Sequence, residues 1–421
     1  MITNARGLSL LLFFFVLAWP LPATVTTAPA QVWGRQLGSA VNDFAGAIAV
    51  DAGGNCIIAG ATSGDLAGKN AGKTDAVIAR FDPTGQMVWS RQFGTPEQDG
   101  IWAVALAANG DALVSGDTGG KLGRAQFGKT DGFLARLDAS GRTLWLEQYG
   151  TAQDDSGRAM ACDASGNIFV AGSTGAKPDG SALPARDAFV RKFDAEGHCL
   201  WIRQWGTEAD EEVHSIGVGP QGALFVTGST TGDLGGHGNA GKTDVFVTRL
   251  NPDGSVVWSR QFGTPAPESG MKLIVSPDGM IYVGGSSAGD FAGPQTGQGD
   301  AILLKLTADG DLVWKRQFGT ARWDGIHGLA LTADGRIVAG GCQNWDQCQA
   351  FLREFDTDGN ELWQTKVATD QVICGTQIGL DARDNIYQVG GTHGPAFGPY
   401  AGKDNDIFLV KLSAEPAPAK P

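Results

Sequence analysis

Residues 89–95 read Trp-Ser-Arg-Gln-Phe-Gly-Thr, and almost the same phrase returns at 258–264 and 314–320. Seven tryptophans begin such a phrase, at intervals of 56, 56, 56, 57, 56 and 49 residues: Trp33, Trp89, Trp145, Trp201, Trp258, Trp314 and Trp363. A glycine follows each of them by 27 residues: Gly60, Gly116, Gly172, Gly228, Gly285, Gly341 and Gly390. Two series with one period indicate seven copies of a single structural unit.

Each copy carries the patterns of four short strands. Small, β-branched and aromatic residues alternate or run together over stretches such as 46–50, 131–137 and 168–171, and Gly, Asn, Asp and Pro separate these stretches. Tight turn sequences such as Asp-Pro-Thr-Gly at 82–85 lead into the tryptophan strand, which we take as the outermost of its sheet. Four-stranded antiparallel sheets repeated seven times predict an all-β fold, the seven-bladed β-propeller, arranged around a central channel.

The two ends of the repeat region predict how the ring closes. The region begins with the tryptophan strand around Trp33 and ends with a strand at 406–412 that no tryptophan follows. We therefore expect the strand of Trp33 to pair with that of Phe408, so that the N-terminal strand closes the last blade and covers what would otherwise be two open sheet edges. The expected divisions are the outer strand of blade 7 at 31–38, then blades 1 to 7 at 42–95, 98–151, 154–207, 210–264, 267–320, 323–369 and 370–412.

The repeated phrases resemble a known family. Trp-x-Arg-Gln-Phe-Gly-Thr, a stretch such as Gly-Asn-Ile-Phe-Val-Ala-Gly-Ser-Thr at 166–174, and Gly-Lys-Thr-Asp-Val-Phe-Val-Thr-Arg-Leu at 241–250 are similar to the bacterial seven-bladed β-propeller repeat (SBBP repeat) family. The resemblance covers residues 31–412. It implies a secreted or surface-exposed propeller, and it implies no catalytic activity, because the shared motif is structural.

Composition and the chain ends predict the setting of the protein. Residues 1–30 read as a secretory signal peptide, with an apolar run at 8–18 and small residues at Ala28 and Ala30, so we expect export to the periplasm, cell surface or medium. Residues 413–421 read as a disordered Pro/Ala tail. The 45 acidic residues against 32 basic ones argue against a nucleic-acid partner. We expect a monomer with no transmembrane segment in its mature chain.

Two acidic series recur with the repeat. The first begins the third strand of six copies, where a carboxylate can accept bonds from backbone N–H groups, at Asp75, Asp131, Asp187, Asp244, Asp300 and Asp406; Gln349 replaces it in the remaining copy. The second lies ten residues after tryptophan, on the link to the inner strand, at Asp43, Asp99, Asp155, Glu211, Glu268 and Asp324; Ile373 breaks it. This second series either braces its loops through hydrogen bonds or binds a divalent cation such as calcium at the channel mouth.

A third position varies among the copies, with six residue types in seven copies, and it is where we expect ligand specificity. Thirteen residues after tryptophan the chain reads Gly46, Trp102, Arg158, His214, Met271, His327 and Thr376. Repeat proteins vary their binding positions on a shared scaffold, so the candidate ligand-binding residues are Trp102, Arg158, His214, Met271, His327 and, beside the acidic series, Trp323. Aromatic, Arg and His groups suit a glycan or protein ligand. The alternative is that these side chains only line a wet channel.

The six cysteines allow disulfides in an exported chain. Cys342 and Cys348 flank the short loop of the sixth blade, and we expect a disulfide between them. We expect the other four, Cys56, Cys162, Cys199 and Cys374, to be buried free thiols.

The sequence therefore predicts an exported, non-catalytic binding or scaffold propeller that recognises its ligand through the face with the long loops. One alternative is an enzyme that acts on polysaccharide with carboxylates at the channel mouth, although every copy offers the same acid. The other is a purely structural envelope protein.

Overall fold

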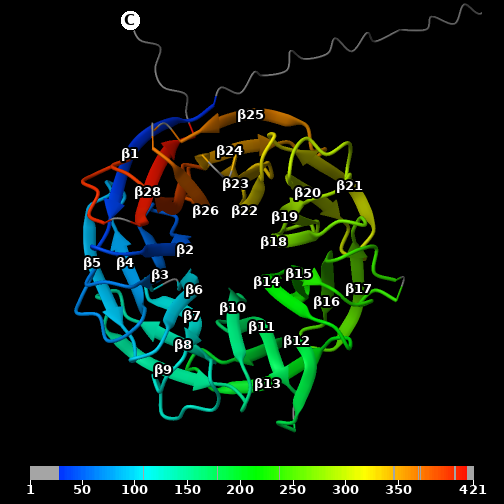
Figure 1. Ribbon diagram of the computed structural model, residues 1–421, viewed down its shortest axis with the longest axis horizontal. Coiled ribbons are helices and arrows are strands. Elements are labelled where there is room, and N and C mark those ends of the chain that lie inside the picture. Colours follow the sequence, from blue (N-terminus) through cyan, green and yellow to red (C-terminus); the bar gives the residue numbers. More distant parts are fainter. Residues whose placement is uncertain are drawn as a thin grey trace, which may run out of the picture.

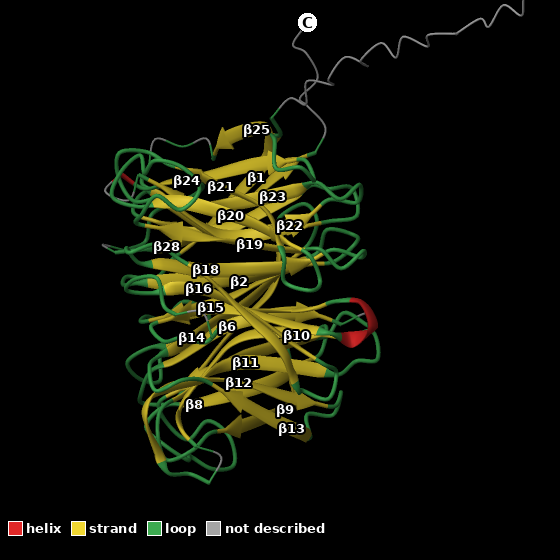
Figure 2. Cartoon of the chain, turned by 90° about the vertical axis from the view of Figure 1, so that its right-hand side faces the viewer, coloured by secondary structure: helices red, strands yellow, loops and turns green. Residues whose placement is uncertain are grey.

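The computed structural model describes residues 28–107, 109–177, 179–236, 238–344, 347–367, 369, 371–402 and 404–414; most of the expected signal peptide and most of the tail lie outside them. Seven four-stranded antiparallel sheets form the blades of a wheel around a central channel (Figure 1), which confirms the predicted seven-bladed propeller. In blades 1 to 6 the first strand of each sheet along the chain is innermost. From the side, the strands run between two faces that carry the loops (Figure 2).

The strands follow the repeat. Blade 1 contains β2 (Asp43–Val50), β3 (Cys56–Thr62), β4 (Asp75–Phe81) and β5 (Met87–Phe93). Blade 2 contains β6 (Asp99–Leu106), β7 (Ala112–Thr118), β8 (Asp131–Leu137) and β9 (Thr143–Tyr149). Blade 3 contains β10 (Asp155–Cys162), β11 (Ile168–Ala176), β12 (Ala182–Phe193) and β13 (Cys199–Trp205). Blades 4 and 5 contain β14 (Glu211–Val218), β15 (Leu224–Thr230), β16 (Asp244–Leu250) and β17 (Val256–Phe262); and β18 (Glu268–Val275), β19 (Ile281–Ser287), β20 (Asp300–Leu306) and β21 (Leu312–Phe318). Blade 6 contains β22 (Gly325–Leu331), β23 (Ile337–Gln343), β24 (Gln349–Phe355) and β25 (Glu361–Lys366). A short 3-10 helix, η1 (Pro220–Gly222), replaces a turn in blade 4.

The seventh blade joins both ends of the repeat region. It contains β26 (Ile373–Leu380), β27 (Ile386–Thr392), β28 (Asp406–Ser413) and, as its outer strand, β1 (Ala30–Leu37). β1 pairs antiparallel with β28, with Trp33 opposite Lys411 and Gln36 opposite Phe408. Figure 1 shows these two strands side by side, blue against red. The predicted closure is therefore confirmed.

The Trp-x-Arg phrase ties several outer strands to the next blade. The indole N–H of Trp33 in blade 7 donates to the carbonyl oxygen of Pro83, in the last hairpin of blade 1, at 3.2 Å. Arg35 lies over the same ring at 5.4 Å from its centre and donates from Nε to the carbonyl oxygen of Gly85 at 2.7 Å. Trp89 and Trp314 make the corresponding bonds one and five blades on. In these three blades the phrase thus fastens the outer strand to the neighbouring blade.

The glycine of that hairpin is required for two reasons. Gly85 has φ +79°, a left-handed conformation that costs L side chains steric strain. A Cβ on Gly85 would also stand 2.8 Å from the indole of Trp33. The turn therefore presents a flat backbone surface on which the ring can rest.

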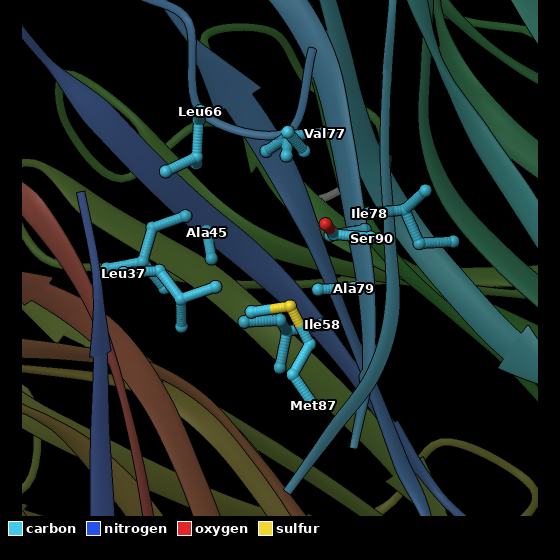
Figure 3. Close-up of a pocket in the computed structure, with 12 residues that line it drawn as sticks. Leu37, Ala45, Ile58, Leu66, Val77, Ile78, Ala79, Met87 and Ser90 are labelled. Carbon is cyan, nitrogen blue, oxygen red and sulfur yellow. The ribbon is translucent and has the colours of Figure 1, made fainter. Parts of the chain in front are cut away.

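The apolar core is divided among the seven blade junctions. Each of the seven buried clusters found among the described residues takes its members from two neighbouring sheets. At the closing junction, Leu37 of β1 and Ile407 of β28 line an apolar cavity of about 110 Å³ together with Ile58 and Val77 of blade 1. Figure 3 shows Leu37, Ile58 and Val77 around it. The lining of this cavity is almost wholly aliphatic, so we interpret it as a packing gap between blades.

The closing strand should carry much of the stability of the ring. Trp33→Ala removes a half-buried ring and its hydrogen bond, and we expect the free energy of unfolding to fall by about 2–3 kcal/mol, somewhat less than for a fully buried tryptophan. The midpoint of thermal unfolding checks this. Val32→Ala, at an adjacent side chain that is 55% exposed, is the control. Equal midpoints for the two variants would contradict the role given to the Trp33 contact.

Candidate functional site

The divergent position of each repeat lies on a β-bulge. In every inner strand the pairing with the second strand skips one residue, or two in blade 3, and the position thirteen residues after tryptophan is always among those skipped. In blade 2, Ile101 pairs with Gly116 and Ala103 with Ser115, which leaves Trp102 outside the ladder. A bulge bends its strand and changes the direction of the side chain that it carries. Here the bulge places one residue of each blade toward the channel, and six of these seven residues carry a side chain.

The second glycine series makes this bulge possible. Gly116 lies opposite the bulge of blade 2, and a Cβ added to it would overlap the carbonyl oxygen of Gly100. The equivalent glycine of each other blade meets a backbone carbonyl of its inner strand in the same way. Only glycine allows so close an approach of two backbones. The glycine that follows each tryptophan by 27 residues is therefore the sequence signal of the bulge, which sequence analysis did not recognise.

The seven residues at the bulges surround one cavity of about 630 Å³ at the mouth of the channel. Its lining includes the whole divergent series, namely Gly46, Trp102, Arg158, His214, Met271, His327 and Thr376. This volume is within the range of small-molecule sites. A narrower space of about 70 Å³ shares part of this lining, and Lys272 borders it. No carboxylate borders either space in the described part of the chain.

Trp102 and Arg158 contact each other on one side of the cavity lining. The guanidinium carbon of Arg158 lies 5.1 Å from the centre of the Trp102 ring, and the indole N–H donates to Oδ2 of Asp117 at 2.7 Å. Asp117 also accepts from the N–H of Gly157 at 2.8 Å. Burial raises the pKa of Asp117, and these bonds oppose the rise. The aspartate thus fixes the indole, and the indole supports the planar guanidinium.

Arg158 keeps most of its donors for a ligand. Its Nε donates to Ser156 Oγ at 3.1 Å, and none of the ion pairs between described residues includes it. The side chain is exposed to the cavity. A guanidinium held flat with two free amino groups suits a carboxylate, which can accept two parallel hydrogen bonds from it.

Two histidines lie farther around the wheel. His214 Nδ1 lies 3.1 Å from the carbonyl oxygen of Gly270, and His327 Nδ1 lies 3.3 Å from that of Gly375. Each ring is therefore tied to the next inner strand. Burial lowers the pKa of His327, which favours its neutral form. Met271 accepts a 3.4 Å bond from Ser269 at its sulfur.

The arc of blades 6 and 7 contributes residues that sequence analysis missed. They come from blades 6 and 7: Cys348, Val372, Cys374, Gly391, His393 and Asn405. Cys342 and Cys348 form a disulfide. The sulfur atoms of both lie within 4.8 Å of the Cys374 sulfur. Burial raises the pKa of Cys374 to about 12, so its thiol stays protonated near neutral pH and exchanges slowly with the disulfide.

The acidic series of the inner-strand links lies beside the mouth but away from the cavity. All six side chains are at most 2% exposed, and none borders the cavity. Asp99 is typical: the N–H and hydroxyl of Thr95 donate to its Oδ2 at 2.6 and 2.8 Å, and the Thr118 hydroxyl donates to Oδ1. In the described residues these carboxylates form no group of three close potential metal ligands; the three cysteine sulfurs do. Calcium binding by this series stays a prediction.

Three further residues, Trp323, Cys162 and Cys199, lie elsewhere than expected. Trp323 does not border the cavity; its ring packs over Gly299 at the end of a loop of blade 5. Cys56 is buried as predicted, but the prediction was wrong for Cys162 and Cys199, which are exposed. Cys162 ends an inner strand and Cys199 begins an outer one, so both stand at the surface where strands enter turns.

Sequence comparisons place the chain near other propellers. The model of a domain of unknown function described as the DUF5122 β-propeller matches residues 276–312. The regulatory protein FlaEY of Caulobacter vibrioides (strain ATCC 19089 / CIP 103742 / CB 15) is 27% identical over 222 residues, which is 47% of this chain and 23% of that protein. The chain thus spans about a quarter of the length of this curated relative. The comparisons support a propeller family, and the narrower SBBP repeat family stays a prediction.

Solved structures agree on the fold. The WD40 β-propeller domain of Doa1 has a TM-score of 0.55 at 11% identity, covering 92% of this chain and 98% of that one. YCF48 bound to D1 peptide has a TM-score of 0.50 at 10% identity, covering 94% and 100%. At this identity the likeness shows the architecture alone.

Within the described residues, no helix has the length and apolar character needed to span a membrane.

The cysteine arrangement predicts a defined pattern of alkylation. We expect four cysteines to react in unfolded, non-reduced protein and six after reduction, because only Cys342 and Cys348 are bonded. In the folded protein, Cys56 should react slowest, because it is buried and its pKa is raised to about 12. Peptide mass spectrometry after iodoacetamide treatment reads out each site. Alkylation of Cys342 or Cys348 without reduction would contradict the disulfide.

Proposed function

We propose that this protein is a non-catalytic binding module that takes a carboxylate-bearing segment of a glycan or protein into the mouth of its channel. The observation that carries the proposal is the convergence of all seven bulged positions on one cavity. Framework residues repeat from blade to blade, whereas this position has six residue types in the seven blades, as expected of a surface that selects a ligand.

The charge of the cavity favours an anionic group. Arg158 offers unpaired donors on the Trp102 ring, and Lys272 borders the space that adjoins it. Burial lowers the pKa of Lys272, and no ion pair among the described residues includes it, so a bound anion would be its first close counter-charge. Phe44 and Trp102, 6.2 Å apart between ring centres, supply aromatic faces on which a sugar or an apolar side chain can rest.

The setting of the proposed module follows from the sequence. The apolar run at 8–18 before a small-residue site supports export, and the acidic composition supports a partner other than nucleic acid. A propeller with a peptide in its solved structure, YCF48, supports a protein segment as one possible source of the carboxylate. We propose that the protein acts as a monomer, since one ring closes its own cavity.

The polysaccharide-acting enzyme receives little support from this geometry. It requires two carboxylates that reach a glycosidic bond, with a separation set by the stereochemistry of the reaction. The six acidic residues predicted for that role are buried under hydroxyl and N–H donors of their own loops, and none borders the cavity.

Titration calorimetry with matched ligands tests the proposal. We expect oligogalacturonides, or peptides with a free C-terminal carboxylate, to bind more tightly than neutral galactose oligomers or C-terminally amidated peptides. Whichever acidic class binds identifies the source of the carboxylate. Arg158→Gln should weaken that binding 10- to 100-fold, the loss expected for a charge-assisted pair.

The control is Arg91→Gln, at an exposed arginine on the outer strand β5, which should leave the affinity unchanged. Failure of all four ligands to bind, or equal affinity of parent and Arg158→Gln, would overturn the proposal. Turnover of the oligogalacturonide would support the enzyme instead.

A further inference from the structure

Two carboxylates face each other at six of the seven blade junctions, and all of them except the half-buried Asp187 are buried. One begins the third strand of a blade, and the other belongs to the link that enters the inner strand of the next blade. The pairs are Asp75 with Asp99, Asp131 with Asp155, Asp187 with Glu211, Asp244 with Glu268, Asp300 with Asp324, and Asp406 with Asp43. None of these acids is included in an ion pair among the described residues.

The junction of Asp300 and Asp324 shows how each oxygen is used. Oδ2 of Asp300 accepts bonds from the N–H and hydroxyl of Thr296 and from Nε2 of Gln317, all at 2.9 Å. Oδ2 of Asp324 accepts from the N–H of Thr320 at 2.7 Å, and its Oδ1 accepts from the N–H of Asn344 at 3.1 Å. Three of the four oxygens therefore have N–H donors that cannot reverse their role.

The fourth oxygen has no partner. Oδ1 of Asp300 is buried without a hydrogen bond, and so is Oδ1 of Asp75, Asp244 and Asp406. This oxygen points at Gly319, the glycine of the tryptophan phrase. A Cβ there would collide with it and would lie 3.0 Å from Oδ2 of Asp324. The unpartnered oxygen of one carboxylate and the carboxylate of the next blade thus border the same small space.

The seventh junction changes all of these residues together. Where the others have two acids and a glycine, it has Gln349, Ile373 and, in the phrase Trp-Gln-Thr-Lys-Val-Ala-Thr, Ala368. The amide oxygen of Gln349 accepts from Lys366 Nζ at 2.7 Å, as the Asp300 carboxylate accepts from Gln317. The glycine is therefore kept where the two carboxylates need the space and lost where they are absent, and a neutral amide replaces the third-strand acid.

We propose that each of the four junctions with an unpartnered oxygen binds one proton, held on Oδ1 of Asp75, Asp244, Asp300 or Asp406 and donated to the facing carboxylate of the next blade. Oδ1 of Asp131 instead accepts from the N–H of Gly128 at 2.9 Å. Two adjacent buried carboxylates without a counter-charge cannot both stay ionised at little cost, and a shared proton removes the repulsion. Only the unpartnered oxygen is open to the proton, because N–H donors occupy Oδ2. The neighbouring groups at the Asp300 junction are the neutral Thr296, Gln317 and Thr320, while the basic Arg322 is exposed.

The direction of the pKa shifts agrees with a retained proton. Burial raises the pKa of Asp324, hydrogen bonds from Thr320 and Asn344 oppose it, and the Asp300 charge raises it further. The same causes, with Asp187, Asp244 and Asp406 as the facing charges, raise the pKa of Glu211, Glu268 and Asp43. A raised pKa in the folded state stabilises the fold below the pKa of the unfolded chain, and this contribution is lost as pH rises through the folded value.

Asp300→Asn tests the proposal at one junction. The amide keeps an acceptor toward Gln317 and puts an N–H where the proton would be, so it mimics the protonated pair at every pH. We expect the thermal midpoint of the parent to fall from pH 5 to pH 8, and that of the variant to fall less and to equal or exceed the parent at pH 8. Asp82→Asn is the matched control, because hydrogen bonds from Thr84 and Gln86 lower the pKa of Asp82, and its loss should destabilise the protein at pH 8.

Infrared spectroscopy reads the proton directly. At pH 7 the parent should show the C=O stretch of protonated carboxyl groups, and Asp300→Asn should lose about one quarter of it, since four junctions with an unpartnered oxygen contribute. A variant that fails to fold leaves this measurement on the parent intact. The proposal is overturned if the parent shows no such band, or if EDTA lowers its midpoint and calcium restores it, which would place a cation between the carboxylates.

Discussion

The pairing of β1 with β28 is the constraint on which the rest of the molecule depends. It runs from Ala30 opposite Ser413 to Leu37 opposite Ile407 and turns seven similar sheets into a ring. A ring gives every blade two neighbours, so each sheet buries both of its faces in junction clusters. Without the closing strand, two sheet edges would be open and blades 7 and 1 would lose the strand whose Trp33 holds them together. The central cavity would then lose its wall.

Closure fixes the frame, and the inner-strand bulge allows it to vary. At the bulge, a glycine of the second strand accepts a close backbone approach, and the residue beside it leaves the ladder. Its side chain has no cross-strand partner to satisfy, so Gly46, Trp102 and His214 can occupy equivalent places without changing the sheet. The bulge therefore explains why the position opposite it on the second strand is glycine in all seven copies. It also explains why the bulged position of the inner strand varies among the copies.

Much of this could be predicted because a repeat reports each structural requirement seven times. The strand order, the closure and the convergence of one divergent series on the channel follow from spacing and turn residues alone. The bulge could not be recognised, since a glycine opposite it resembles any strand glycine in sequence. Trp323 was misplaced and the residues around Cys374 were missed, because their positions depend on the paths of loops. Loops do not repeat with the sequence period that allows the strands to be predicted. Side-chain exposure at strand ends, as for Cys162, has the same origin.

A symmetric ring cannot orient a ligand, so orientation must come from residues that break the symmetry. The structure breaks it in two places. Blades 2 and 3 supply the Trp102–Arg158 pair, while the arc of blades 6 and 7, where the acid pair is lost and the loop is shortened, supplies Cys348, Cys374 and His393. A ligand whose carboxylate meets Arg158 would therefore extend across the cavity toward blade 7. On this argument the decayed copy is less a relic of the repeat than the feature that gives the cavity a direction.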